Sequence, residues 1–110
     1  PARTLLLTVY PIPEKTELLR NYPNPLNPET WIPYQLAEEA FVTLTIYNMM
    51  GRVVRTINVG HRPAGMYLSR DKTIYWDGRN DTGEPVSSNV YFYVLSAGNY
   101  TATRKMVILK

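Results

Sequence analysis

The chain has 110 residues, of which 45% are hydrophobic and 19% charged, and its net charge is +3. This composition excludes a disordered chain and fits one globular domain with a single core. The absence of cysteine excludes disulfides and thiolate zinc sites. The basic residues are scattered among acidic ones, a pattern that predicts a solvated surface and no nucleic-acid partner.

The first 18 residues are the least regular part of the sequence and are predicted to be a linker or N-terminal arm. Residues 5–10 are apolar and could form a short strand, which we expect to pair with a sheet edge of its own domain or of a neighbouring copy. This run is far shorter than the ~20 residues of a membrane span, so no span is predicted. Because the chain starts at Pro1 without methionine, we expect a piece of a longer polypeptide.

A proline-rich segment follows at residues 22–28 and predicts a rigid turn. It contains Pro23, Asn24, Pro25, Asn27 and Pro28. Each proline fixes its own φ and keeps the preceding residue extended, so a helix is excluded here.

Two alternating segments come next. In residues 30–36, Ile32, Tyr34 and Leu36 share one face, and Pro33 places the strand at an edge or leaves one position unpaired. Residues 41–48 alternate with Val42, Leu44 and Ile46 predicted to point inward. The turn ending at Gly51 then predicts a hairpin.

The return strand is predicted at residues 52–59, where the spacing of Val54 and Ile57 indicates a bulge. Residues 60–65 are predicted to be a loop. Residues 66–68 and 73–76 are two short extended pieces, and residues 77–83 form a polar turn.

The last two strands are the most apolar. Residues 86–96 carry apolar side chains on both faces, which predicts a central strand covered on both sides. The final strand, residues 101–110, places Met106 and Ile108 on one face and Val107 and Leu109 on the other. About seven strands and no helical period predict an all-β, immunoglobulin-like β-sandwich, with a small barrel as the alternative.

The residue types needed for catalysis are sparse, and we expect no enzyme activity and no cofactor. There is no cysteine, and His61 is the single histidine, in a predicted loop. Glu38 and Glu39 are adjacent on an extended connection, so their carboxylates should diverge.

One turn contains a set of oxygen ligands that calcium could use. Its candidate residues are Asp77, Asn80, Asp81 and Glu84. Their spacing does not match an EF-hand, and such residues usually serve the backbone of the turn, so no metal is predicted.

Exposed aromatic residues give another candidate site. Trp31, Tyr47 and Tyr75 are predicted to face away from the core and could stack on sugar rings. The alternative, which we favour, is that they cover neighbouring loops or the N-terminal arm.

The segment Asn21-Tyr22-Pro23-Asn24-Pro25-Leu26-Asn27-Pro28-Glu29-Thr30 resembles the opening motif of C-terminal sorting domains of the type IX secretion system. Those domains are similar to the immunoglobulin-like domain of the flagellar hook-capping protein. Further matching pieces are Val42-x-Leu44-x-Ile46-Tyr47-Asn48, Ala64-Gly65-Met66-Tyr67, Trp76-Asp77-Gly78-Arg79, Val90-Tyr91-Phe92-Tyr93 and residues 104–110. The resemblance covers residues 19–110. Leu26 replaces the usual Phe, Asn89 replaces a frequent Gly, and residues 68–73 are longer than in many members.

The resemblance implies a domain that ends a larger exported protein and directs it across the outer membrane of a Gram-negative bacterium to the surface or exterior. It implies secretion-machinery proteins of the outer membrane as partners. It also implies that the sorting signal is the final strand, with Lys105, Met106, Val107, Ile108, Leu109 and Lys110. The alternatives are a structural spacer and an adhesion or carbohydrate-binding β-sandwich of a cell-surface protein.

Overall fold

The computed structural model describes residues 12–110, and these residues form a two-layered β-sandwich. Its strands are β1 (Glu17–Leu18), β2 (Thr30–Ile32), β3 (Tyr34–Leu36), β4 (Ala40–Tyr47), β5 (Val53–Arg62), β6 (Gly65–Tyr67), β7 (Ile74–Trp76), β8 (Asn89–Ala97) and β9 (Tyr100–Ile108). The predicted all-β, immunoglobulin-like sandwich is confirmed, and within the described range no helix interrupts the strands. In particular, residues 12–110 contain no helix of the length and apolarity that a bilayer requires.

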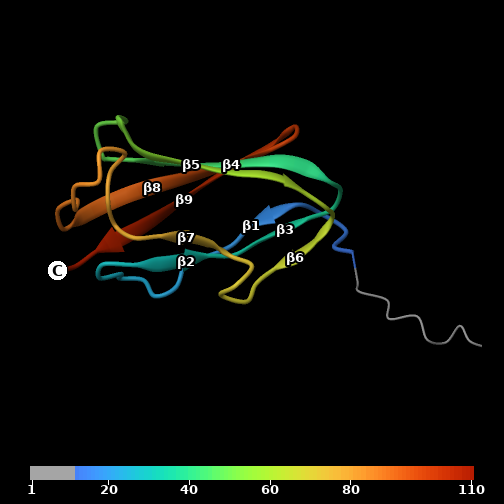
Figure 1. The fold of residues 1–110 in the computed structure, drawn as a ribbon, viewed down its shortest axis with the longest axis horizontal. Coiled ribbons are helices and arrows are strands. Elements are labelled where there is room, and N and C mark those ends of the chain that lie inside the picture. The colour runs from blue at the N-terminus through green and yellow to red at the C-terminus, as the bar shows by residue number, and fades with distance from the viewer. Residues whose placement is uncertain (1–11) are drawn as a thin grey trace, which may run out of the picture.

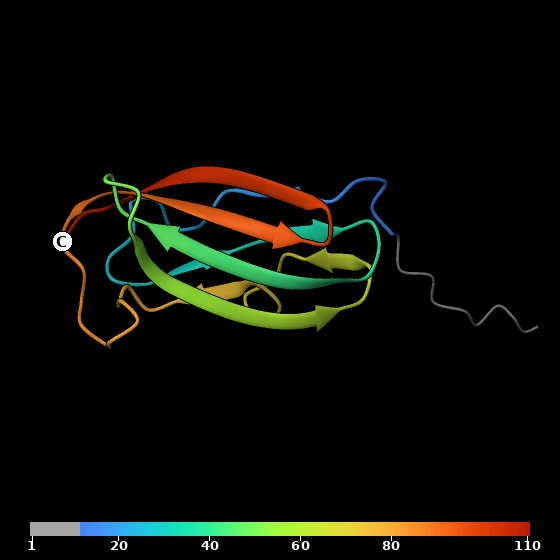
Figure 2. The same ribbon diagram turned by 90° about the horizontal axis from the view of Figure 1, so that it is seen from above.

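One layer is a four-stranded antiparallel sheet in the order β5-β4-β8-β9. The other layer contains the sheet β1-β3-β6 and the pair β2-β7. Figure 1 shows the two layers edge on, and Figure 2 shows the four long strands from above, with β5 and β9 at the two edges.

The predicted strand at residues 30–36 is divided at Pro33 into β2 and β3, which pair with different partners. Trp31 of β2 lies opposite Tyr75 of β7, whereas Tyr34 of β3 lies opposite Tyr67 of β6. Proline has no N–H to donate to a ladder, so the sheet changes partner at this residue. This division, together with β1, accounts for nine strands where about seven were predicted.

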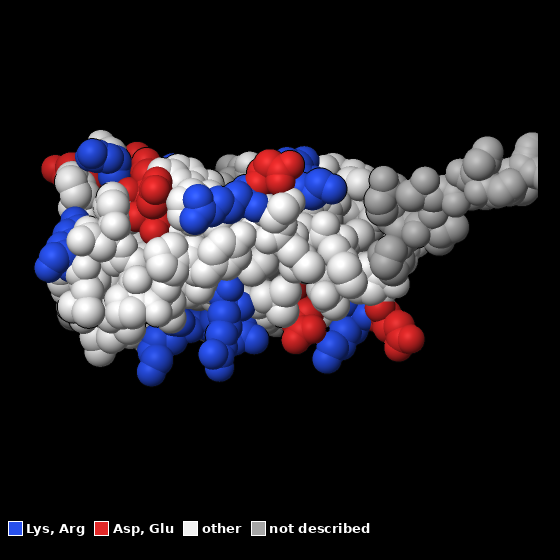
Figure 3. Space-filling model, turned by 90° about the horizontal axis from the view of Figure 1, so that it is seen from below, with Lys and Arg blue, Asp and Glu red and all other residues white. Residues whose placement is uncertain are grey.

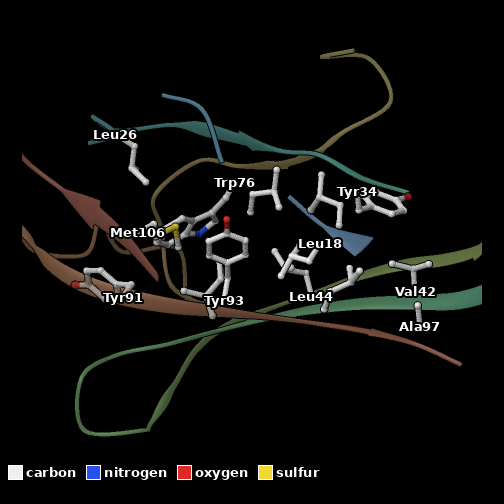
Figure 4. Close-up of a cluster of buried hydrophobic side chains, with 14 of the residues drawn as sticks. Leu18, Leu26, Tyr34, Val42, Leu44, Trp76, Tyr91, Tyr93, Ala97 and Met106 are labelled. Atoms are coloured by element: carbon white, nitrogen blue, oxygen red, sulfur yellow. The ribbon is translucent and has the colours of Figure 1, made fainter. Parts of the chain in front are cut away.

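The core lies between the two layers and follows the predicted alternation. Val42, Leu44 and Ile46 of β4 are each no more than 1% exposed. Trp76 and Tyr93 approach each other from opposite layers at the centre, as Figure 4 shows. Such aromatic and aliphatic side chains each contribute about 1.5–3 kcal/mol when fully buried.

Strand β5 ends later in the chain than predicted, and it contains the predicted bulge. It continues through His61 to Arg62, so the predicted loop at residues 60–65 was wrong at its start, because His61 pairs with Phe41 of β4. The register between β4 and β5 shifts at two places, which confirms the predicted bulge.

Strand β8 is central in its sheet, as predicted, and its inward residues Tyr91, Tyr93 and Leu95 are buried. The expected cover on both sides was wrong. Val90 and Phe92 stay partly exposed, because no further layer of the described residues packs on this side.

The chain enters the sandwich through β1, which contains the last two residues of the predicted arm. Leu18 is buried, and Glu17 lies opposite Gln35 of β3. The expected strand at residues 5–10, and its docking on a sheet edge, lie outside the described residues.

Candidate functional site

The predicted signal residues occupy the edge strand β9 and the chain end beyond it. Met106 and Ile108 are buried at 0% and 1% exposure, because their side chains alternate toward the core. Val107 is partly buried, and Lys105 and Lys110 are exposed. The segment therefore combines a buried structural face with an accessible one.

The proline turn lies directly against this strand. Leu26 forms a parallel bridge with Ile108: its N–H donates to the Val107 carbonyl at 2.9 Å, and its carbonyl accepts the Leu109 N–H at 3.1 Å. Asn24 Oδ1 accepts the Val107 N–H at 3.0 Å. We call this set of contacts between residues 24–26 and 107–109 the clasp. It satisfies backbone groups that an edge strand otherwise leaves open.

The alternation of prolines with other residues explains the geometry of the clasp. Leu26 has an N–H to donate, whereas its neighbour Pro25 does not. The Leu26 side chain is fully buried and points into the core above Met106 (Figure 4). Pro23, Pro25, Asn27 and Pro28 lie at the surface around it.

A buried network holds the start of the turn. The Asn21 amide Nδ2 donates to Thr30 Oγ1 at 3.0 Å and to the Pro23 carbonyl at 3.2 Å. The Tyr93 hydroxyl accepts the Asn21 N–H at 3.0 Å and donates to the Leu19 carbonyl at 2.9 Å. Burial raises the pKa of Tyr93 above its ordinary value. The turn is thereby fixed to the central strand β8.

Gly78 supports the turn from the other side. Its φ is +80°, and a Cβ at this position would collide with the Pro28 carbonyl oxygen. Only glycine combines that φ with so close an approach to another backbone. The Trp76-Asp77-Gly78 piece of the family motif therefore packs on the proline piece.

The oxygen-rich turn that suggested calcium is occupied by other donors. Asp77 Oδ1 accepts from Arg55 Nη1 at 3.0 Å and from the Arg79 N–H at 3.0 Å. Asp81 Oδ1 accepts the Thr56 N–H at 3.0 Å, and Asn80 Oδ1 accepts the Glu84 N–H at 2.9 Å. Within residues 12–110, no group of three or more acidic or histidine side chains is placed to hold a metal ion. These side chains support the turn and connect it to the edge of β5.

The three candidate aromatic residues do not form one platform. Trp31 and Tyr75 are neighbours on the β2-β7 pair, with ring centroids 5.7 Å apart, whereas Tyr47 is on β4 in the other layer. The guanidinium of Arg70 lies 3.9 Å from the centre of the Trp31 ring and covers it. Figure 3 looks onto the layer of Trp31, where charged side chains gather mainly along the two long margins.

Among the described residues, His61 forms an ion-pair contact with Glu39. Its Nε2 lies 3.6 Å from Glu39 Oε1, and the two side chains are 61% and 72% exposed. No side-chain hydroxyl is hydrogen-bonded to the His61 ring in the described part of the chain.

An open groove of about 770 Å³ lies between β5 and the strands β6 and β7. Its floor includes Tyr34 and Tyr67, whose rings stack with centroids 4.7 Å apart. Burial raises the pKa of Tyr34 to about 12, and the nearby Tyr67 adds to the shift, while Arg62 opposes it. The groove contains no signal residue.

Sequence reasoning singled out the proline turn and the last strand separately, and the structure brings them together. It included Asn21, Thr30 and Tyr93 in the motif pieces but assigned no role to them, and their hydrogen bonds hold the turn in place. A short polar residue next to a proline run was the available signal for Asn21, but nothing in the sequence identified Tyr93 as its partner.

Part of the chain is similar in sequence to known proteins. The chain is 38% identical over 58 residues to the basal-body rod modification protein FlgD of Salmonella typhimurium and to that of Salmonella typhi. Each match covers 53% of this chain and 23% of the relative, so the chain spans less than a quarter of those proteins.

Two solved structures share the fold. The dimeric latent PorU of Porphyromonas gingivalis matches 86% of this chain and 9% of its own, with a TM-score of 0.64 at 19% identity. PorZ of the same organism, described as a surface component of the type-IX secretion system, matches 83% of this chain and 11% of its own, with a TM-score of 0.57 at 18% identity. The sequence model of the FlgD Ig-like domain family matches residues 29–103, which include β2 to β8. The chain therefore belongs to the FlgD Ig-like domain family.

Proposed function

We propose that this domain is a non-catalytic C-terminal sorting and anchoring module, which directs a larger protein through a type IX secretion system to the cell surface or exterior. The observation that carries the proposal is that the last strand has some side chains buried in the core and others exposed. Met106 and Ile108 fix it in the core, while Lys105, Leu109 and Lys110 remain exposed. Within residues 12–110, no ion pair involves the side chain of Lys105 or Lys110, which suits recognition by a partner.

The clasp supports the same proposal, because it joins the two pieces of sequence that resemble the sorting motif. Asn24 and Leu26 occupy the free edge of β9 at Val107. A partner would therefore bind the side chains of β9 at this point, because the backbone edge of the strand is already paired.

Fold similarity adds support of a coarser kind. PorU and PorZ contain a region of the same fold, and PorZ is described as a component of the type-IX secretion system. The proposed partners are accordingly proteins of the outer-membrane secretion machinery of a Gram-negative bacterium. The proposal includes no catalysis, cofactor, nucleic acid or membrane span.

The second candidate is a structural spacer or interaction domain of a surface or flagellar protein. The family match to FlgD favours it, since FlgD is described as a basal-body rod modification protein. A carbohydrate-binding role has less support, because Arg70 covers the Trp31 ring.

An export experiment that compares hosts with and without a working type IX system distinguishes these candidates. The chain is fused to the C-terminus of a reporter that carries its own inner-membrane leader, in a host with a type IX system and in the same host lacking the translocon. The sorting module predicts reporter in the medium or on the surface of the first host only. Equal retention in both hosts would favour the spacer.

A further inference from the structure

The outer surface of the four-stranded sheet is apolar at one end and polar at the other. At the end near the β4-β5 turn lie the exposed Val53 and the partly exposed Tyr47, Val90, Phe92 and Val107, which together we call the apolar end. At the other end the outward positions are mainly Thr, Ser and Asn, apart from Phe41, which is 70% exposed at the start of β4. A solvent-facing side of an antiparallel sheet is normally polar along its whole length, so the apolar end is unusual.

The strand register shows that the apolar end is contiguous. Tyr47 lies opposite both Val53 and Phe92, and Val90 lies opposite Val107. Val53 is 53% exposed, and the adjoining turn exposes Met49 at 61% and Met50 at 78%. A continuous exposed apolar surface of this kind indicates an interaction site.

The charges of this sheet have one sign. The sequences of β4, β5, β8 and β9 contain no Asp or Glu. Lys105 lies directly opposite Phe92, at the border of the apolar end. In the described part of the chain, the ion pairs involve Arg55 and His61, so no carboxylate lies within 4.0 Å of Lys105.

We infer that the apolar end docks a protein of the export machinery that supplies apolar side chains and a carboxylate for Lys105. This inference rests on the proposed function and names the surface that the machinery contacts. Val107 and Lys105 belong both to the signal strand and to this surface, so recognition of the signal and docking of the sheet are one event.

The position of Lys105 favours such a partner over two others. A second copy packed face to face would offer Lys105 no carboxylate from its own sheet, because β4, β5, β8 and β9 contain no Asp or Glu. A lipid surface offers only diffuse headgroup charge. An ammonium group that is covered at the border of an apolar surface needs a fixed counter-charge, which a protein carboxylate supplies.

The test uses the reporter fusion in the host with the secretion system. Phe92→Asp and Val53→Asp place a charge in the apolar end, and Ser96→Asp places the same charge at the polar end of β8 as the matched control. Val53 is already half exposed, so its variant should fold even if Phe92→Asp does not, and thermal unfolding checks each purified domain. We expect export to fall at least tenfold for the first two variants and to stay within twofold of wild type for Ser96→Asp.

The outcomes separate this inference from the proposed function. If folded Phe92→Asp and Val53→Asp are exported normally while deletion of residues 105–110 blocks export, the docking surface is wrong and the sorting role stands. If the deletion also leaves export unchanged, both fail. Flotation of the purified domain with phosphatidylglycerol vesicles, lost in Phe92→Asp, would replace the protein partner with a lipid. Dimerisation lost in the same variant would replace it with a second copy.

Discussion

Leu26 and Ile108 lie side by side in a parallel bridge that joins the proline turn to the last strand of the domain. Both side chains are buried, and the Leu26 backbone forms hydrogen bonds on either side of Ile108, with the Val107 carbonyl and the Leu109 N–H. The two motifs that resemble a sorting domain are therefore one structural unit, and its stability and its recognition can be tested separately.

Truncation of the buried face of β9 should destabilise the domain. Met106→Ala and Ile108→Ala each leave a cavity in the core, and we expect each to lower the free energy of unfolding by about 2–5 kcal/mol. Lys105→Ala removes an exposed side chain and should change it by less than about 1 kcal/mol. Urea denaturation measures all three; a loss for Lys105→Ala as large as that for Ile108→Ala would contradict this division of the strand.

The clasp should depend on Asn24 and not on Asn27. Asn24→Ala removes the acceptor of the Val107 N–H, and we expect a loss of about 0.5–1.5 kcal/mol together with faster exchange of the Val107 amide. Asn27 is exposed and precedes a proline in the same way, so Asn27→Ala is the matched control. Hydrogen exchange followed by NMR would disprove the clasp if Val107 exchanged at the same rate in both variants.

The Tyr93 hydroxyl should contribute to stability through the backbone of the N-terminal segment. Tyr93→Phe leaves the Asn21 N–H and the Leu19 carbonyl without their partner, at a cost of about 1–3 kcal/mol. Tyr47→Phe removes a hydroxyl for which no hydrogen bond is formed within the described residues, and it should be close to neutral. Equal unfolding midpoints in denaturant for the two variants would count against the network.

Alkaline pH should destabilise the domain through Tyr34. The pKa of Tyr34 is raised from 10.0 to about 12, chiefly by burial, so the folded state holds this proton more tightly than the unfolded state. The stabilisation that the protonated Tyr34 hydroxyl contributes is therefore complete below pH 10, and it is lost progressively as the pH rises toward 12. The free energy of unfolding should fall less steeply over this interval in Tyr34→Phe than in the wild type. Parallel pH profiles for the two proteins would refute this role of Tyr34.

The strands were predictable because their side chains alternate, and alternation is a local property. Val42, Leu44 and Ile46 carried enough information to place β4 and its buried face. The clasp was not predictable in this way, since pairing of Leu26 with Ile108 depends on how the two layers stack. The cover expected over Phe92 failed for a related reason: an apolar outer face indicates burial against a partner as readily as burial within one chain.

Deletion of residues 105–110 from the reporter fusion tests the central claim most directly, because it removes the proposed signal. The deletion also removes two core side chains, so Met106→Ala, which weakens the core but keeps the exposed signal residues, is the matched control. The measured quantity is the fraction of reporter that reaches the medium or cell surface in a host with a type IX secretion system. The account predicts that export is abolished by the deletion and retained in Met106→Ala at a temperature where that variant is folded. Normal export of the deleted fusion would contradict the sorting role and leave the structural spacer as the better account.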